Sequence, residues 1–403
     1  MRIAVFHNLS SGGAKRVLHD FVRYLSGNGH DVDAYCPSTA DEAYLPLRQV
    51  ARKVEVFPVK KTLSGAIHSR LLYVPMKDAP LRDQERTQEE IAESVNRQDY
   101  DVVISEQDRY TMSPFFLKFV KKPTVYYCQQ PSRFDDISFR NTQSKSGAYP
   151  PSTRWRQMVH KHYDSRLPDI DRRNASFARF ILANSYFSRE SILRSYGLNA
   201  HVSYLGVDTG VFKPLGISKE NIVLSVGSCF SSKGFDFIIN SIALVDKRIR
   251  PGLVIVSNSG DPAWKSYLQQ LASRAGVNME IRDAVADSEL VSLYNRAELV
   301  LCASYLEPFG LVPIEAMACG TPVIAVREGG FRESVVHNQT GKLVDRDCTE
   351  FSKAVSQLLT DSEARGTMSR KGLDAVRNFW TLNHAGKRLL GNLEQAVSSS
   401  DER

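Results

Sequence analysis

The sequence predicts an α/β protein built from two Rossmann-like domains. Three observations support this fold class. The chain begins with a strand-like run, RIAVFHN at 2–8, followed by a glycine turn and a helical pattern over 14–26, which is how an open α/β sheet starts. A second start of the same kind, NIVLSVG, occurs at 221–227. The length of 403 residues is sufficient for two domains that each bury their own core.

Composition limits the class of protein. The apolar fraction of 42% and the charged fraction of 24% are those of a globular chain. No apolar run approaches about 18 residues and no basic, apolar leader is present, so we expect neither a membrane span nor a secretory signal. The six cysteines are scattered without metal-ligand spacing. They predict reduced core thiols in a cytoplasmic protein.

The net charge of +7 is unevenly distributed along the chain. Residues 1–200 contain 30 Lys+Arg against 22 Asp+Glu, a balance of +8, whereas residues 201–403 contain 22 against 23, a balance of −1. A basic first half could attract an anionic acceptor, a membrane surface or nucleic acid, although a solvated basic surface is the commoner explanation. Zinc-finger spacing, an RNA-recognition aromatic pair and a separate basic arm are absent. We therefore expect no nucleic-acid partner.

The first half continues the α/β pattern. The turn after the first strand contains Gly12 and Gly13 but is not G-x-G-x-x-G, so the dinucleotide fingerprint is absent. A strand over 31–37 completes a βαβ unit, and a charged helical segment precedes the strand YDVVIS at 100–105. The run MSPFFLKFVKKP at 112–123 is aromatic with a lysine-rich end. It predicts a core helix, with an element at a bilayer surface as the alternative.

The end of the first half is polar and basic. The strand TVYYC at 124–128 leads into Gln129, and residues 141–173 predict a loop followed by a helix. The arginines of this segment either bind a phosphate on an acceptor or solvate a helix. A strand and helix from residue 180 close the first domain. We expect the domain boundary near residue 205.

The most informative stretch is EPFGLVPIEAMACG at 307–320, between the strand-like runs ELVLCAS and PVIAV. Pro313 suits the first turn of a helix, and Gly320 suits the left-handed residue that ends one. Gly310 allows the backbone to approach a ligand, and the helix N–H groups beginning near Leu311 have no internal partner. These features predict an anion site of the size of a diphosphate.

Two carboxylates flank this predicted anion site. Glu307 and Glu315 cannot bind phosphate, so we expect them to accept hydrogen bonds from hydroxyl groups, a sugar at Glu307 and a ribose at Glu315. The alternative is a solvated loop residue and a first-turn helix carboxylate favoured by the dipole. Lys233, in the loop after the strand at 221–227, is a candidate cation for the charge of a leaving diphosphate.

The E-x7-E pattern in EPFGLVPIEAMACGTPVIA resembles the signature of family 4 retaining nucleotide-sugar glycosyltransferases, which have the GT-B fold. The resemblance implies two Rossmann-like domains facing across a cleft. Residues 1–204 would form the acceptor-side domain and residues 205–380 the nucleotide-sugar domain. The terminal helix, 381–403, would cross back to the first domain.

The resemblance also implies roles for individual residues. Glu307 and Lys233 would be catalytic. The donor would be bound by Ser228, Lys233, Val285, Glu307, Phe309, Gly310, Leu311 and Glu315, and the cleft would be lined on the acceptor side by Gly12, Gly13 and Gln129. The chain departs from the family at two positions, because Gln129 stands where many members have histidine and Ser228 where an arginine is usual.

The implied activity is transfer of a hexose-type sugar from a nucleoside diphosphate sugar to a hydroxyl of a glycan, lipid-linked, anionic or small-molecule acceptor, with retention. We expect no metal or cofactor, since no D-x-D pair is predicted in a loop where it would hold a metal and Asp31-Val32-Asp33 lies at a strand start. The alternative is a catalytically weak companion protein that binds a sugar nucleotide without turning it over. A cytoplasmic location is expected, with peripheral contact at the inner membrane face as a further alternative.

Overall fold

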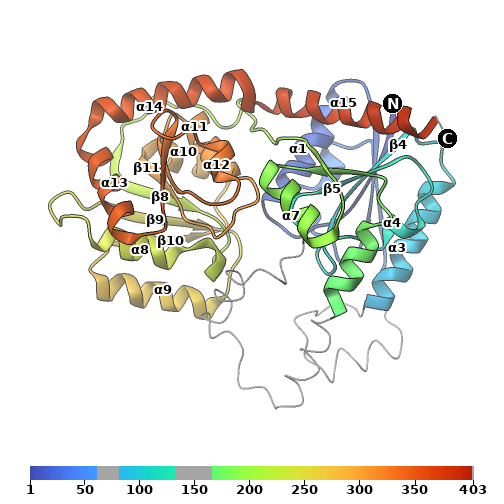
Figure 1. Ribbon diagram of the computed structural model, residues 1–403, viewed down its shortest axis with the longest axis horizontal. Helices are drawn as coiled ribbons and strands as arrows, with labels where there is room; N and C mark the ends of the chain where they lie inside the picture. Colours follow the sequence, from blue (N-terminus) through green and yellow to red (C-terminus); the bar gives the residue numbers. More distant parts are fainter. Residues whose placement is uncertain (61–80, 132–165, 402–403) are drawn as a thin grey trace, which may run out of the picture. The chain divides into compact units, whose positions relative to one another are not determined.

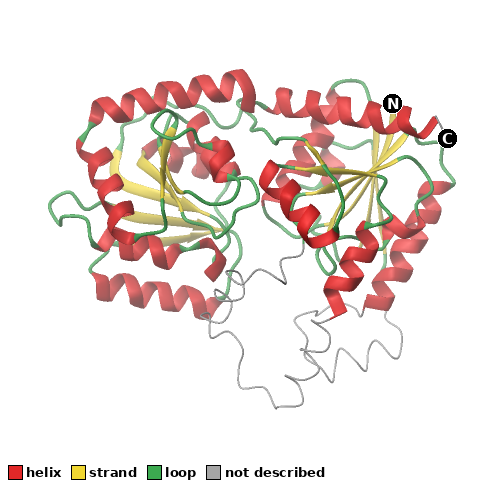
Figure 2. Cartoon of the chain, in the orientation of Figure 1, coloured by secondary structure: helices red, strands yellow, loops and turns green. Residues whose placement is uncertain are grey.

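The computed structural model describes residues 1–60, 81–131 and 166–401. The chain forms two compact units, of which the first contains the described residues up to Tyr204 together with those from Gly386 onward, and the second extends from Leu205 to Ala385. Each unit is an open sheet covered by helices on both faces (Figure 2). This architecture confirms the predicted fold class of two Rossmann-like α/β domains.

The first unit is built on a seven-stranded parallel sheet in the order β3-β2-β1-β4-β5-β6-β7. The strand order reverses between β1 and β4, and ligands of open α/β sheets bind at the carboxyl ends of strands that flank such a reversal. The strands are β1 (Arg2–Asn8), β2 (Asp31–Pro37), β3 (Lys53–Phe57), β4 (Val102–Asp108), β5 (Thr124–Cys128), β6 (Phe180–Ala183) and β7 (His201–Val202). The helices are α1 (Gly13–Gly27), the 3₁₀ turn η1 (Leu47–Gln49), α3 (Leu81–Asn96), α4 (Phe116–Phe119) and α7 (Tyr186–Tyr196).

The second unit contains a six-stranded parallel sheet in the order β10-β9-β8-β11-β12-β13, which reverses between β8 and β11. Its strands are β8 (Glu220–Val226), β9 (Gly252–Ser257), β10 (Met279–Asp283), β11 (Ala297–Cys302), β12 (Val323–Val326) and β13 (Gly341–Val344). Its helices are the 3₁₀ turn η2 (Ser231–Lys233), α8 (Phe235–Ala243), α9 (Pro262–Ala275), α10 (Asp287–Arg296), α11 (Leu311–Ala318), α12 (Phe331–Ser334), α13 (Cys348–Thr360), α14 (Ser362–Ala375) and the π-helical turn η3 (Val376–Trp380).

The last helix, α15 (Leu382–Asp401), begins in the second unit and continues in the first. Within the first unit it packs closely at Gly386, where a Cβ atom would collide with the ring of Tyr24. A glycine at this position therefore allows the helix to approach α1 (Figure 1).

Local sequence explains the boundaries of several helices. Ser185 caps α7 by accepting a hydrogen bond from the Ser188 N–H, and Gly197 ends that helix in the left-handed conformation. Asp261 caps α9, which has proline at its first position and left-handed Gly276 at its end. The six cysteines, all of them in the described residues, form no disulfide, and five are buried.

The aromatic run at 112–123 belongs to the core of the first unit. Phe115, Phe116 and Leu117 are buried, and the ring of Phe116 stacks on that of Phe6 with centroids 4.4 Å apart. The predicted helix is much shorter than expected, because only Phe116–Phe119 are helical. Val120 is already extended, and the chain enters Pro123 and β5 without another helical turn.

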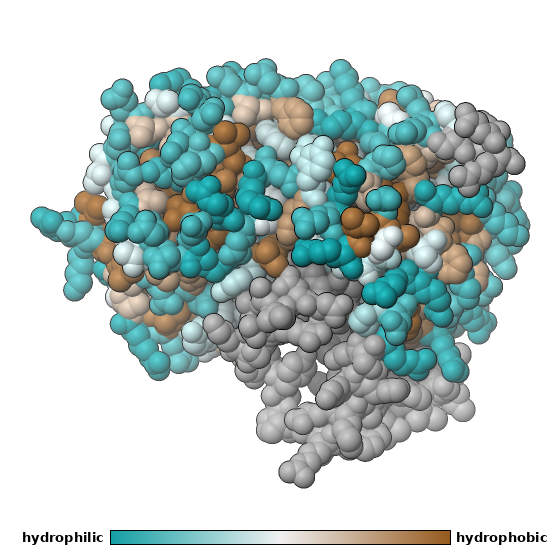
Figure 3. All heavy atoms as spheres, viewed as in Figure 1, coloured by the Kyte–Doolittle hydropathy of each residue, from teal (hydrophilic) through white to brown (hydrophobic). Residues whose placement is uncertain are grey.

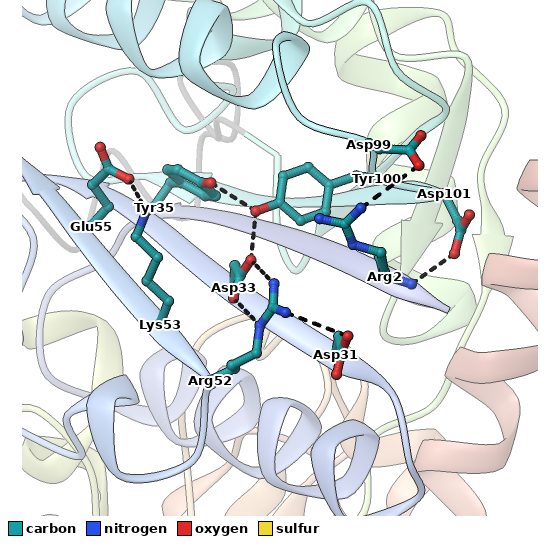
Figure 4. Close-up of polar contacts among 10 residues, drawn as sticks. All are labelled: Arg2, Asp31, Asp33, Tyr35, Arg52, Lys53, Glu55, Asp99, Tyr100 and Asp101. Carbon is teal, nitrogen blue, oxygen red and sulfur yellow. Dashed lines mark hydrogen bonds and ion pairs between the residues drawn. The ribbon is translucent and has the colours of Figure 1, made fainter.

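The D-x-D sequence of β2 is part of a hydrogen-bond network at the amino ends of the strands (Figure 4). Arg52 donates to both oxygens of Asp33, at 2.9 and 2.5 Å, and the Tyr100 hydroxyl donates to the same carboxylate at 2.7 Å. Burial alone would raise the pKa of Asp33, but these hydrogen bonds outweigh it and leave the pKa below its usual value. This carboxylate therefore joins β2 to β3 and to the start of β4.

Hydrophilic side chains predominate on the surface face shown in Figure 3. Among the described residues, no helix is both long and apolar enough to cross a membrane. Of the predicted polar segment at 141–173, residues up to 165 lie outside the described residues, and residues 166–175 are helical. Arg172 in this helix donates to the Ser195 carbonyl at 3.1 Å.

Candidate functional site

The predicted donor residues meet at the strand reversal of the second unit. Lys233 follows β8 and Glu307 follows β11, the two strands between which the order reverses. Lys233 Nζ lies 2.7 Å from Glu307 Oε2, and the two side chains are 28% and 20% exposed. Solvent can therefore reach this ion pair, so an anion could replace Glu307 as the partner of Lys233.

The backbone around this pair is held by close contacts. Gly234, which follows Lys233, has a φ of 67°, and a Cβ atom there would collide with the Ala303 carbonyl. The Tyr305 N–H donates to the Ser232 carbonyl at 2.8 Å. The loop after β8 and the loop after β11 therefore contact each other main chain to main chain.

Helix α11 begins at Leu311, so Pro313 lies in its first turn as predicted, and Gly320 follows the helix with a φ of 75°, also as predicted. Gly310 has a φ of 100°, and a Cβ atom there would come within 2.8 Å of a ring carbon of Phe331. Only glycine suits both the conformation and the space at this position. The first N–H groups of α11 thus follow directly on a constrained turn.

Glu315 does not lie in the first turn of α11, as the sequence suggested, but in the second. Its residue exposure is 6%, and its Oε2 atom accepts a hydrogen bond from the Tyr294 hydroxyl at 2.7 Å. Burial, with Glu315 beside it, raises the pKa of Tyr294 well above its usual value. The interpretation of Glu315 as a dipole-favoured first-turn carboxylate is therefore wrong, and Tyr294 orients this carboxylate.

The other predicted donor residues lie around the same sheet edge. The Ser228 hydroxyl accepts a hydrogen bond from the Ser259 hydroxyl at 3.0 Å. Val285 is half-buried between β10 and α10. Phe309 is 2% exposed, and its ring lies 5.6 Å from that of Trp380. The Phe309 side chain is thus a packing group, which leaves only its backbone for a ligand.

The structure adds a glycine turn that supports Glu307. Gly330 N–H donates to the Glu307 carbonyl at 2.7 Å, and Cβ atoms at Gly329 and Gly330 would collide with the backbone of Glu307 and Phe309. The sequence shows this turn as E-G-G after β12, but its contact with the loop after β11 requires the fold.

Arg346, which follows β13, links the loop after β11 to the loop after β12. Its guanidinium donates to both carboxylate oxygens of Glu328 at 2.7 Å and to the carbonyls of Ala303 and Ser304 at 2.9 and 3.1 Å. The charged group also lies 3.7 Å from the centre of the Tyr305 ring. Sequence reasoning missed Arg346, which follows β13 without any motif to mark it.

In the first unit, Gly12 and Gly13 lie where β1 passes into α1, at the reversal of that sheet. A polar cluster that the sequence did not reveal lies beside them. Lys15 is fully buried and contacts Glu42, while His7 Nε2 lies 3.1 Å from Glu42 Oε1. Burial would raise the pKa of Glu42, but hydrogen bonds from His7 and Lys15 lower it to about 2.

Gln129 follows β5, and its side chain contacts a carboxyl group that sequence reasoning also missed. Gln129 Nε2 donates to Glu106 Oε2 at 3.1 Å. Glu106 lies near the end of β4 and is fully buried, which raises its pKa to about 8. The available signal was the polar run of residues 106–108 at the end of an apolar strand. Within the described residues, no group of three His, Cys, Asp or Glu side chains could hold a metal ion.

Two family models match the chain in succession. The model described as Glycosyltransferase Family 4 matches residues 11–211, and the model described as Glycosyl transferases group 1 matches residues 209–374. The chain belongs to the family 4-type glycosyltransferases. The motif at 307–320 had predicted this family membership.

Solved structures of similar fold align with nearly the whole length of this chain. HepE from Anabaena, in complex with UDP and glucose, is 19% identical with a TM-score of 0.73 and covers 98% of this chain and 99% of its own. Sucrose-phosphate synthase from Thermosynechococcus elongatus is also 19% identical, with a TM-score of 0.74 and 99% coverage of both chains. At this identity the likeness shows the fold alone, which is GT-B.

Curated relatives match a smaller part of the chain. The D-inositol 3-phosphate glycosyltransferase of Segniliparus rotundus is 36% identical over 190 residues, 43% of this chain and 42% of the relative. That of Stackebrandtia nassauensis is 32% identical over 219 residues, 48% of each protein. The chain thus spans less than half the length of these curated relatives.

Proposed function

We propose that this chain is a retaining glycosyltransferase that moves a hexose-type sugar from a nucleoside diphosphate sugar to an acceptor hydroxyl. The observation that carries the proposal is the partly exposed Lys233–Glu307 pair, with 2.7 Å between Nζ and Oε2, at the strand reversal of the second sheet. A cation, a carboxylate and a helix amino end occur together in this region. These are the groups that a diphosphate and a sugar require.

In the proposed reaction, Lys233 exchanges Glu307 for the diphosphate, and the N–H groups of α11 from Leu311 onward share the anion. Charge that develops on the departing diphosphate is then stabilised by groups already in place. Glu307 orients a sugar hydroxyl. The bond from the anomeric carbon to the phosphate oxygen breaks, the acceptor oxygen bonds to the same face of that carbon, and the departing phosphate takes the acceptor proton.

The remaining donor contacts follow from the same placement. Glu315 accepts from a ribose hydroxyl with Tyr294 fixing its orientation, and the constrained Gly310 brings backbone close to the diphosphate. Val285 lines the base pocket, and Ser228 supports the phosphate weakly. No step of this reaction requires a metal ion.

In the proposed reaction the acceptor binds to the first unit. The acceptor side of the proposed site is formed by Gly12, Gly13 and Gln129 of the first unit. The net positive charge of the first half of the chain suits an anionic acceptor. The relatives named D-inositol 3-phosphate glycosyltransferases make inositol phosphates the first acceptors to test. The complexes of HepE with UDP and UDP-glucose make UDP-glucose the first donor.

The proposal is tested by measuring the melting temperature of the full chain with a panel of nucleoside diphosphate sugars. A donor present at 100 times its dissociation constant should stabilise the folded state by about 2.7 kcal/mol, which raises the melting temperature. Transfer to inositol phosphates and to glycan acceptors is then followed with that donor, with and without a chelator. If no sugar nucleotide changes the melting temperature, the proposal is wrong.

A companion protein without turnover is the second candidate, favoured by Ser228 and Gln129 at positions where the family usually has charged or titratable groups. Donor binding without transfer to any acceptor, and without slow donor hydrolysis, would favour that candidate.

A further inference from the structure

Glu106 is an isolated carboxyl group at the strand reversal of the first sheet. It lies near the carboxyl end of β4, which together with β1 flanks the point where the strand order reverses. Its side chain is fully buried. Of its two oxygens, Oε2 accepts from Gln129 Nε2 at 3.1 Å and, more weakly, from the Gln107 N–H at 3.4 Å, whereas Oε1 has no partner among the described residues.

The groups around Glu106 do not compensate a negative charge. Within the described part of the chain, Glu106 forms no ion pair, and burial is the dominant influence on its pKa, with the two hydrogen bonds opposing it. The titratable groups near it on β4 and the two neighbouring strands include Asp108 on β4, His7 on β1, and Tyr127 and Cys128 on β5, of which Tyr127 and Cys128 interact with Glu106 electrostatically. The cations that act on these groups are Lys15 of α1, on His7, and Arg388 of α15, on Tyr127. Burial raises the pKa of Tyr127 and Cys128, so both stay neutral. The two cations are otherwise engaged, since Lys15 contacts Glu42 and Arg388 donates to the Tyr204 carbonyl.

Gln129 connects this carboxyl group to the edge of the sheet where ligands bind. It follows β5 directly, and its main-chain carbonyl accepts from the Ser188 hydroxyl at 3.2 Å, which fixes the backbone. Its side-chain nitrogen is directed at Glu106, and none of the described residues donates to its side-chain oxygen. An amide has a donor end and an acceptor end, so the end bound to Glu106 determines which end remains for a ligand.

We propose that Glu106 is a positioning residue for the transfer reaction: when ionised it holds the Gln129 amino group, so that the Gln129 carbonyl accepts a substrate hydroxyl, and when protonated it donates to that carbonyl and reverses the amide. This inference rests on the proposed glycosyl transfer and deepens it at the acceptor side. The protonation state of Glu106 thus determines whether Gln129 presents a hydrogen-bond acceptor or a hydrogen-bond donor to the substrate.

Gln129 Nε2 is directed toward Glu106 Oε2, which is the arrangement that the ionised carboxylate requires. A hydroxyl held by a carbonyl keeps its oxygen lone pairs available for attack, so the ionised arrangement is the productive one. Because burial raises the pKa of Glu106 to about 8, the ionised fraction grows through the neutral and mildly basic range. Activity should therefore increase with pH across that range.

The first test is the pH profile of kcat/KM between pH 6 and about 9.5 for the full chain and the E106Q variant, with UDP-glucose or whichever donor raises the melting temperature. One ionisation near pH 8 raises the active fraction about tenfold between pH 7 and 9, and E106Q should lose this rise because its amide does not titrate. Q129A should lose it as well.

The matched control is D108N. Asp108 is also buried on β4, but its carboxylate is held by Asn8, Gln88 and two backbone N–H groups. D108N should keep the rise of the parent chain. Equal pH dependence in the parent chain and E106Q would overturn the proposal.

A second readout does not need activity. Infrared difference spectra between pH 6 and about 9.5 should show loss of one carboxylic acid carbonyl band near pH 8, and E106Q should lack that band. Absence of the band from the parent chain overturns the assignment of Glu106 even if transfer is observed. A failure of the proposed function would give a different result. The parent chain would then show no transfer at any pH, while its carboxylic acid band would still titrate.

Discussion

Each unit contains a Lys–Glu pair at the carboxyl edge of its sheet, and the two pairs differ in their access to solvent. In the second unit, Lys233 and Glu307 are 28% and 20% exposed. In the first, Lys15 is fully enclosed and Glu42 is 22% exposed, with His7 as a third member. An accessible pair can exchange a partner for a ligand, whereas an enclosed charge that loses its partner is left without compensation. The same two residue types thus suit binding in one unit and folding in the other.

The largest effect that tests this comparison is expected at Lys233. K233M should lower kcat/KM for the donor by at least about 100-fold, because it removes a preorganised cation from the leaving diphosphate. The free energy of unfolding should change by less than about 1 kcal/mol, since the pair is partly exposed. Steady-state kinetics and urea unfolding measure the two quantities.

The control for this variant is K353M, which removes a surface lysine paired with Glu350 in the same unit. Its activity should equal that of the parent chain. Equal loss of activity in the two variants would contradict the proposed role of Lys233 as the cation that binds the diphosphate.

The second effect is on stability and is expected at Glu42. E42Q should lower the free energy of unfolding by about 3 kcal/mol or more, because it leaves the charge of Lys15 buried and unpaired. E307Q should cost less than about 1 kcal/mol in the same urea experiment. Equal costs for the two variants would remove the distinction between the pairs.

The enclosed pair also predicts an acid dependence. The pKa of Glu42 is lowered from about 4.5 to about 2 in the folded chain, so its contribution to stability is present above pH 4.5 and is lost as the pH falls toward 2. Urea unfolding of E42Q should therefore depend less steeply on pH in this window than unfolding of the parent chain. A parallel dependence in both proteins contradicts the assignment.

The smallest effect concerns the support of the accessible pair. R346M should raise the KM for the donor about tenfold, because charge-assisted hydrogen bonds of about 1.5–3 kcal/mol hold the loops that carry Glu307. R346K should recover only part of this loss, since lysine cannot form the two parallel bonds to Glu328. Steady-state kinetics of the two variants, with melting temperatures as the stability control, separate local positioning from unfolding.

The sequence was sufficient for those parts of the molecule that depend on local pattern. The strand and helix at the start of each sheet, the helix ended by Gly320 and the motif with Glu307 are all signalled within about twenty residues. Lys233 was predicted as a cation for the diphosphate because it follows the first strand of a domain, where α/β proteins bind anions. Its contact with Glu307, 74 residues away in the chain, could only be observed in the fold.

The remaining parts depend on contacts between distant segments. Glu106 and Gln129 meet because β4 and β5 are neighbours, and Lys15 meets Glu42 across 27 residues. No periodicity marks such residues, since a lysine or glutamate reads as a surface residue until its surroundings are known. The predicted turn position of Glu315 was wrong for a simpler reason, since a helix that begins at Leu311 has Glu315 in its second turn.

The glycines at 234, 329 and 330 bring three loops of the second unit into direct main-chain contact. The course of the loop after β11 is therefore determined by backbone against backbone, and the side chains that it presents contribute little to it. Such a loop can accept substitutions at its exposed positions while its path stays unchanged. Variation of donor preference by directed evolution should accordingly be sought in these side chains, with the three glycines left intact.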